Sequence, residues 1–214
     1  PYFDLDFSLL LNNTNIPIDI KGSVPLNIQD DKLDLRVNGN GKFIKLIDIL
    51  AEDYFTFIEG KVTTRMIIKG SINKPIANGF IVINNSEVDI YNNIFKNIKG
   101  TLLFDFDHME TDEITATDVD DGTISIKGSF PFYAKNILVN RDFNLKTENF
   151  KLTNNNFKFL VDSKLKISGS FQNPIIGGLL KLSDGFIDLN KDFEPTNFNS
   201  RKKIKNINSQ KKVK

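Results

Sequence analysis

The residues most able to do chemistry in this 214-residue chain lie together between positions 105 and 113, in the segment DFDHMETDE. This segment holds the chain's single histidine, His108, among five carboxylates. Such a group is typical of general acid–base catalysis or of a site for a hard cation. One histidine, however, supports neither a two-histidine metal site nor a triad with a second histidine elsewhere. We therefore favour an amphipathic strand, with Phe104 and Phe106 inward, that runs into a solvated acidic loop.

Three other motifs have the residue types of known sites but not their spacing. Asp118–Gly122 (DVDDG) resembles the start of a calcium loop, but its glycine falls one place early and no glutamate stands at the twelfth position. The Gly-Ser pairs lack the flanks of a nucleophile elbow, and Gly39–Gly41 (GNG) does not lead into a long phosphate-binding helix. All of these predict turns, so we expect no catalytic residue, no metal site and no cofactor.

The charged residues are unevenly distributed along the chain. Residues 201–214 contain no acid and seven basic residues, which are Arg201, Lys202, Lys203, Lys205, Lys211, Lys212 and Lys214. The remaining body has 21 basic and 27 acidic residues, a net charge of −6. An acidic body argues against a nucleic-acid-binding domain. Residues 191–214 are expected to form a basic, disordered linker or loop that contacts anionic membrane, or that is simply solvated.

Composition narrows the class of protein further. With 19 Phe, no Trp and abundant Ile and Asn, the chain favours strands and turns. It has no cysteine, which excludes disulfides and thiolate chemistry but leaves the compartment open. No apolar run approaches the roughly 18 residues of a membrane span. The chain opens at Pro1 and enters an alternating pattern at Phe3, so we expect it to be part of a longer protein.

The elements that would position any site are strands, because the dominant hydrophobic period is two. In the first strand apolar residues from Phe3 to Leu9 alternate with polar ones. Similar runs follow at Ile16–Ile20, Leu33–Val37, Val62–Ile68, Phe80–Ile83, Val88–Ile90, Leu102–Phe106, Ile124–Phe130, Phe143–Leu145, Phe157–Val161, Leu165–Phe171 and Phe186–Leu189. Asn-Gly, Asp-Gly, Asn-Asn and Gly-Gly steps between them predict hairpin turns. The one helical candidate is residues 42–54, where apolar residues recur every three or four positions.

Internal repetition is the most informative feature of the chain. The tetrapeptide Ile-x-Gly-Ser occurs four times, ending at Ser23, Ser71, Ser129 and Ser170. Two copies extend further, because Ile68–Ile90 and Ile167–Leu189 align without a gap. The repeat predicts an all-β, elongated, curled sheet over residues 1–190, shaped like a trough.

The repeat unit predicts a strand that ends at Gly-Ser, a short connection closed by proline, and a glycine that begins the next strand. The other two copies are shorter, with Pro25 and Pro131 three residues after the glycine. The residues assigned to turns and structure are Gly22, Gly70, Pro75, Gly79, Gly128, Gly169, Pro174 and Gly178.

Strands with apolar side chains on one face predict a continuous apolar surface. Because the chain has almost no helix to cover that face, a second sheet or lipid must cover it. The candidates for this surface are Phe3, Leu5, Phe7, Ile18, Ile20, Leu35, Met66, Ile68, Phe104, Phe106, Ile124, Ile126, Phe157, Phe159, Leu165 and Ile167. They either line a groove or fill a closed core. The sequence leaves both open.

The repeat resembles the C-terminal repeats of the TamB family of translocation and assembly module proteins, related to the AsmA-like proteins. The resemblance is carried by the motif G-S-x-x-x-P-x-x-x-G at Gly70–Gly79 and Gly169–Gly178, by the segment Gly41–Gly60 and by the step Ile98–Leu102 (IKGTL). The charged tail departs from the family's pattern, and no barrel-docking end is identifiable.

The resemblance implies a non-enzymatic envelope protein, anchored in the inner membrane by a segment absent from this chain, on the periplasmic or intermembrane side of a double membrane. Relatives occur in plastid envelopes. It implies a trough called a β-taco, with phospholipid acyl chains and an outer-membrane barrel protein as partners, in lipid transport, protein secretion or outer-membrane assembly. A structural or adhesive β-solenoid with a closed core is the alternative. Carbohydrate processing ranks last, because its carboxylate pair is expected only in loops.

Overall fold

The computed structural model describes residues 2–9, 18–25, 32–41, 55–71, 74–133, 141–154, 156–171 and 173–188. These residues form eleven strands and no helix, which confirms the all-β class. The strands are β1 (Tyr2–Leu9), β2 (Ile18–Pro25), β3 (Leu33–Gly41), β4 (Phe55–Ser71), β5 (Lys74–Ile90), β6 (Asn93–Phe106), β7 (His108–Thr117), β8 (Thr123–Pro131), β9 (Phe143–Thr153), β10 (Phe157–Ser170) and β11 (Asn173–Ile187). The helix expected over 42–54 and the basic tail expected over 191–214 lie outside the described residues.

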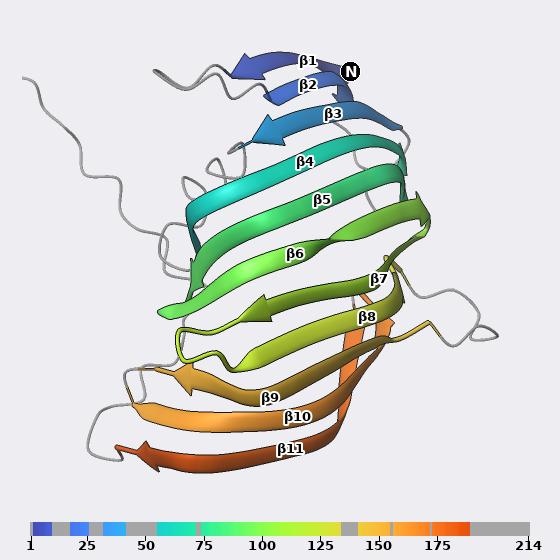
Figure 1. The fold of residues 1–214 in the computed structure, drawn as a ribbon. Helices are drawn as coiled ribbons and strands as arrows, with labels where there is room; N and C mark the ends of the chain where they lie inside the picture. The colour runs from blue at the N-terminus through green and yellow to red at the C-terminus, as the bar shows by residue number, and fades with distance from the viewer. Residues whose placement is uncertain are drawn as a thin grey trace, which may run out of the picture.

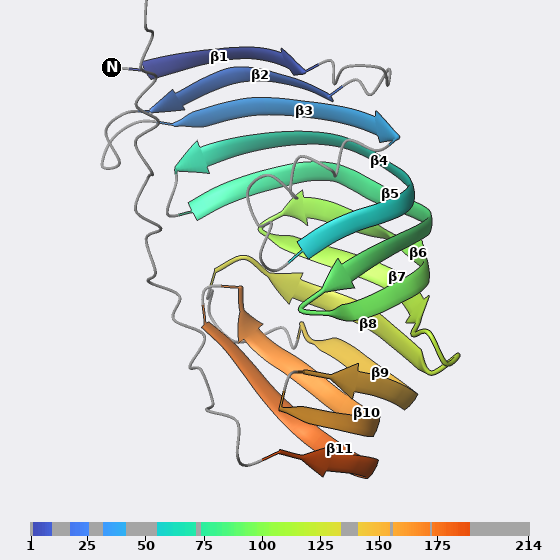
Figure 2. The same cartoon turned by 90° about the vertical axis from the view of Figure 1, so that its left-hand side faces the viewer.

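All eleven strands belong to one antiparallel sheet whose spatial order is the chain order, from β1 at one edge to β11 at the other (Figure 1). Each strand therefore pairs only with strands next to it in sequence, as alternating strands with short connections favour. The long strands bend, so the sheet curls along its strands (Figure 2). The predicted elongated, curled sheet is confirmed.

Several strands contain an extra residue with a left-handed backbone. Asn85 in β5, Asn97 in β6, Asn149 in β9 and Asp184 in β11 have φ between 41° and 52°, and the register shifts beside each of them. Asn and Asp tolerate this conformation better than other non-glycine residues, and an extra residue bends a strand. The Asn84-Asn85 step is thus a bulge inside β5, and its prediction as a hairpin turn is wrong.

Other predicted turns also lie inside strands. Gly177-Gly178 is within β11, and the Gly39–Gly41 segment pairs with β4 as the end of β3. The turn predicted at the Asn92-Asn93 step is confirmed, with its turn residues at 91–92, and so is the turn at 118–122. Because the other steps are bulges or ladder positions, short apolar runs such as Phe80–Ile83 and Val88–Ile90 join into one 17-residue strand.

The repeat unit is a hairpin of two long strands. Gly70-Ser71 closes β4, and Pro75 lies opposite Gly70 as the second residue of β5. The second copy has the same arrangement, with Pro174 of β11 opposite Gly169 of β10. The Gly-Ser steps do end β4 and β10, whereas those containing Gly22 and Gly128 lie inside β2 and β8 close to their ends. Gly79 and Gly178 do not begin strands, since both lie five residues inside them.

The most buried apolar cluster lies at the bend of β4, β5 and β6. Phe57, Val62 and Val88 are 3%, 1% and 6% exposed and are surrounded by partly buried neighbours. These neighbours are Phe55, Ile81, Ile83, Ile90, Phe95 and Ile98. Because each bulge adds one residue to its strand, odd-numbered and even-numbered residues of the same strand can face the same side. The bulges thereby bring all of these residues onto the inside of the curl.

Candidate functional site: the apolar inner face

The strand register places all sixteen predicted surface residues on one face of the sheet, which we call the inner face. Residues directly opposite each other in an antiparallel pair share a face. One such row contains Phe7, Ile20, Val37, Met66, Gly79, Phe104, Met109 and Phe130. Another contains Gly100, Ile114, Ile126, Leu145, Leu165 and Gly178. The inner face is therefore continuous from β1 to β11.

The inner face is neither dry nor fully open. Of the thirteen candidates with described side chains, Ile18 is buried, Phe106 is 60% exposed at the end of β6, and the other eleven are partly exposed. For Phe3, Leu5 and Phe7 only the backbone is described, and it places them on this face. A closed core would bury nearly all of them. The partial exposure favours an accessible surface.

Phenylalanines connect strands along the inner face. Ring centroids lie 5.5 Å apart for Phe130 and Phe143 and 5.3 Å apart for Phe95 and Phe150. The contact between Phe95 and Phe150 joins β6 to β9. These two strands extend beyond the turn that connects β7 to β8, and there they contact each other directly. The Asn93 side chain links the two strands at this point, because it accepts a hydrogen bond from Thr153 N at 2.7 Å and donates one to Thr153 O at 3.0 Å. The sheet is thus fastened at this rim.

Buried hydroxyl groups interrupt the apolar lining, and the sequence pattern did not reveal them. Thr147 Oγ1 lies 2.9 Å from both Val161 O and Ser163 Oγ, and Thr64 Oγ1 donates to Phe80 O at 3.0 Å. Serine and threonine satisfied by neighbouring strands carry little cost of burial. Once the strand register is known, these hydroxyl residues can be identified, because each lies opposite an inner-face residue of the next strand.

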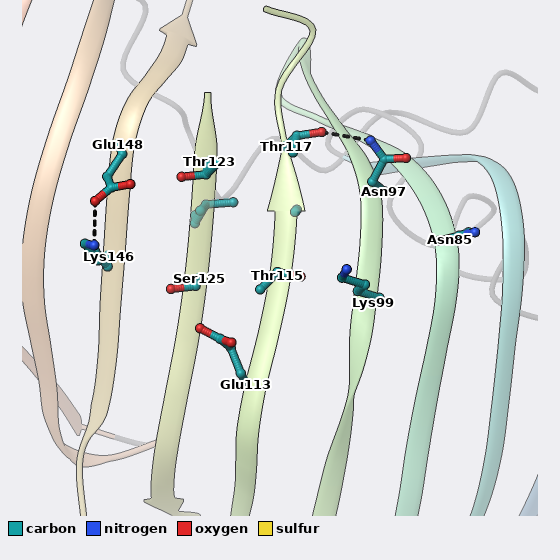
Figure 3. Close-up of a pocket in the computed structure, with 12 residues that line it drawn as sticks. Asn85, Asn97, Lys99, Glu113, Thr115, Thr117, Thr123, Ser125, Lys146 and Glu148 are labelled. Atoms are coloured by element: carbon teal, nitrogen blue, oxygen red, sulfur yellow. Dashed lines mark hydrogen bonds and ion pairs between the residues drawn. The ribbon is translucent and has the colours of Figure 1, made fainter. Parts of the chain in front are cut away.

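The opposite, outer face carries a shallow hollow of about 550 Å³ over β5 to β9, and most of the residues that line it are polar (Figure 3). Its polar lining residues are Asn85, Asn97, Lys99, Glu113, Thr115, Thr117, Thr123, Ser125, Lys146 and Glu148. Lys146 pairs with Glu148, and Asn97 donates to Thr117 Oγ1 at 3.1 Å. The hollow lacks any aromatic platform, so it has the character of a solvated sheet surface.

The loop that resembled a calcium site is held by backbone hydrogen bonds. Asp118 is 3% exposed, and its Oδ1 accepts from the N–H groups of Asp120 and Gly122 at 2.7 and 2.9 Å. Its Oδ2 accepts from the N–H of Lys151 in β9. Both oxygens are therefore occupied by donors, which confirms the prediction of a turn. In the described part of the chain, no group of three or more His, Cys, Asp or Glu is arranged to hold a metal ion.

An exposed ion pair flanks this loop. The hydrogen bond from Lys151 lowers the pKa of Asp120, and the hydrogen bond to Asp120 raises the pKa of Lys151. The pair therefore favours the folded state above the unfolded-state pKa of Asp, about 3.9, and below that of Lys, about 10.4. This contribution is lost as Asp120 protonates in acid or Lys151 deprotonates in base, and salt screens it.

Replacing Asp118 with alanine is expected to lower the free energy of unfolding by about 2 kcal/mol, because three backbone N–H groups would lose their acceptor in a buried place. Asp118→Asn keeps one acceptor oxygen and should cost less. Urea denaturation checks this order. Millimolar Ca²⁺ should leave the wild-type midpoint unchanged, and a rise in the midpoint with Ca²⁺ would contradict the turn assignment.

His108 begins β7 and is 7% exposed, so the solvated acidic loop expected here is in fact a strand. Its Nδ1 lies 3.2 Å from Asp107 Oδ1, and its Nε2 lies 4.0 Å from Glu110 Oε2. Arg141 Nη1 is 3.3 Å from the same Asp107 oxygen. The Asp107 carboxylate thus contacts both the histidine and Arg141. These contacts hold the first residue of β7 in place.

The fold and the site place this chain in the class of all-β proteins that are built on an open antiparallel sheet and present an apolar inner face. By sequence, the chain is 24% identical over 140 residues to Protein TIC236, chloroplastic, from Arabidopsis thaliana. The match covers 62% of this chain and 6% of that protein. No protein-family model matches the chain, and no solved structure matches it. No helix in the described residues is long and apolar enough to cross a membrane.

Proposed function

We propose that this chain is a non-enzymatic segment of a TamB-like envelope protein, whose inner face holds phospholipid acyl chains between two membranes. The observation that carries the proposal is the inner face, which the strand register makes continuous over all eleven strands and on which most candidates with described side chains are partly exposed. An apolar surface of this extent in a soluble setting marks an interaction site.

The physical scale suits a lipid. Eleven strands spaced about 4.8 Å apart extend on the order of 50 Å along the sheet. Each methylene moved from water onto an apolar surface contributes about 0.8 kcal/mol when fully buried. Acyl chains would therefore be held by area alone, without a specific headgroup site, and could move from strand to strand.

The likeness to a chloroplastic protein and the resemblance of the repeat to the TamB family together support our proposal of a place in the envelope of a double-membrane compartment. We propose the intermembrane or periplasmic side, with anchoring to the inner membrane outside this chain. Handling of outer-membrane proteins with a barrel partner belongs to the same proposal. A contact of the basic tail with anionic membrane does too.

Photo-crosslinking with matched positions tests the lipid proposal. A photoreactive residue at inner-face Ile126 or Phe159 should crosslink phospholipid, and one at the adjacent outer-face Lys127 or Lys158 should give at most a tenth of that yield. Mass spectrometry of the purified chain should also find co-purified phospholipid. Absence of lipid in both measurements would sink the proposal.

A structural or adhesive solenoid with a closed core remains the competing function, favoured by the tightly buried cluster of Phe57, Val62 and Val88. It predicts equal, background crosslinking at Ile126 and Lys127. The same experiment therefore decides between the two.

A further inference from the structure

The middle of the outer face carries a group of apolar side chains. They belong to β4, β5 and β6 and are Ile67, Ile76, Phe80, Val82 and Leu103. Phe80 lies directly opposite Leu103, and Ile67 is its diagonal neighbour on β4. Ile67 and Leu103 are 41% and 43% exposed. Because β4, β5 and β6 each have a strand on both sides, this exposure does not come from an edge of the sheet (Figure 1).

One row of residues that crosses this group carries opposite charges at its two ends. Arg65 on β4 lies opposite Phe80 on β5. Leu103 on β6 lies opposite both Phe80 and Glu110, which belongs to β7. Arg65 is exposed, and the side chain of Glu110 is 48% exposed. The row therefore reads cation, apolar, apolar, anion from β4 to β7.

The two charges cannot form an ion pair within one chain. Arg65 and Glu110 are three strands apart, roughly 14 Å at a spacing of about 4.8 Å between strands. The neighbouring row has its charges in the same order, with Arg36 on β3 and Asp105 on β6. The apolar group thus has a basic side towards β3 and an acidic side towards β7.

A row with this order is complementary to itself. When a second copy is turned by half a turn about an axis that runs parallel to the strands between β5 and β6, β5 of each copy faces β6 of the other. In the same way β4 faces β7. Arg65 of each copy then faces Glu110 of the other, and Phe80 faces Leu103. Such a contact is isologous, which is the arrangement found in most homodimers.

The order of the charges selects a second copy as the occupant of this face. A partner with one sign of charge, such as an anionic membrane surface, would match one end of the row and be repelled by the other end. A second copy matches both ends at once, and its own apolar residues cover the centre.

We propose that this chain forms a two-fold dimer through the outer face of β4 to β7. Five apolar side chains from each copy make a small interface, so the dimer exchanges with the monomer. The inner faces of both copies point away from the contact and stay accessible. The dimer does not depend on the inner face taking lipid, so the two proposals fail separately.

Sedimentation equilibrium of the whole chain over a concentration series tests the dimer. The wild type should show a monomer–dimer equilibrium. Leu103→Asp should raise the dissociation constant at least tenfold with an unchanged circular dichroism spectrum, because it places a charge in the apolar centre. Lys164→Glu, an exposed charge reversal on the outer face of β10, is the matched control and should leave the dissociation constant unchanged.

A mixing experiment tests the two-fold geometry. Arg65→Glu and Glu110→Arg should each dimerise at least tenfold more weakly than the wild type, because like charges then meet at both ends of the row. Mixed in equal amounts, the two variants should form a heterodimer about as readily as the wild type dimerises, since both ion pairs are restored between unlike copies.

Three results would overturn this inference. The first is a wild type that stays monomeric at every concentration. The second is a dimer that Leu103→Asp leaves intact, which would place the contact elsewhere. The third is a mixture of Arg65→Glu and Glu110→Arg that associates no better than either variant alone, which would assign this face to a partner other than a second copy.

Discussion

Replacing Gly79 with alanine is expected to lower the free energy of unfolding by about 3 kcal/mol. Gly79 lies inside β5 with φ of 144°, a conformation essentially confined to glycine. A Cβ at this position would lie 2.0 Å from Arg65 O and 2.8 Å from Met66 Cα, both in the backbone of β4. Because β4 is held on both sides by ladder hydrogen bonds, it cannot yield without losing pairing. The cost combines strained backbone with a displaced strand.

Urea denaturation followed by circular dichroism measures this effect, and Gly177→Ala is the control. Gly177 lies in β11, where an added Cβ meets nothing within 4 Å, so its replacement should change the free energy of unfolding by less than about 0.5 kcal/mol. Equal midpoints for Gly79→Ala and wild type would show that the close approach of β4 and β5 is not required.

Much of the fold was predictable because strand pairing between sequence neighbours leaves few alternatives. Period-two patterns predicted which residues share a face, and the register places all sixteen candidates there. The repeat predicted the hairpins closed by Gly-Ser and proline, with Gly70 opposite Pro75 and Gly169 opposite Pro174. These are local features, so a single sequence carries them.

The curl of the sheet was predicted, but the bulges that accompany it were not, because a bulge reverses the parity on which face assignment depends. In β5 the inner-face residues are Ile81 and Ile83 before Asn85 but Ser86 and Val88 after it. The two apolar runs therefore looked like separate strands around a turn. An asparagine between apolar residues of opposite parity is the signal that identifies such a bulge.

Strand β7 was missed for a different reason. Its sequence is acidic, and its inner-face residues are few, with Met109 and Ile114 separated by a register shift. Pairing to β6 and β8 on both sides supplies the strand that its own composition does not favour. Tertiary context thus decides the structure around His108, which is why a solvated loop was expected there.

Replacing Phe57 with alanine is expected to lower the free energy of unfolding by about 4 kcal/mol, the largest single effect among these predictions. Phe57 is 3% exposed and packs with Val62 and Val88 where β4 and β5 bend. Removing a buried phenylalanine costs its transfer free energy together with the cavity that remains, about 3–5 kcal/mol in all. The bulges on both sides of this cluster are held in place by packing. The strands should therefore not move together to fill the cavity that the missing phenyl ring leaves.

Ile58→Ala provides the matched control, because Ile58 is the next residue in β4 and is 40% exposed on the other side of the strand. Its replacement should cost less than about 1 kcal/mol. Chemical denaturation of both variants measures the difference. Because the rest of the inner face is only partly buried, we expect Phe57→Ala to open the bend while strands β8 to β10 keep their hydrogen-exchange protection. Uniform loss of protection across the sheet would instead show that this cluster and the remaining strands unfold as one cooperative unit.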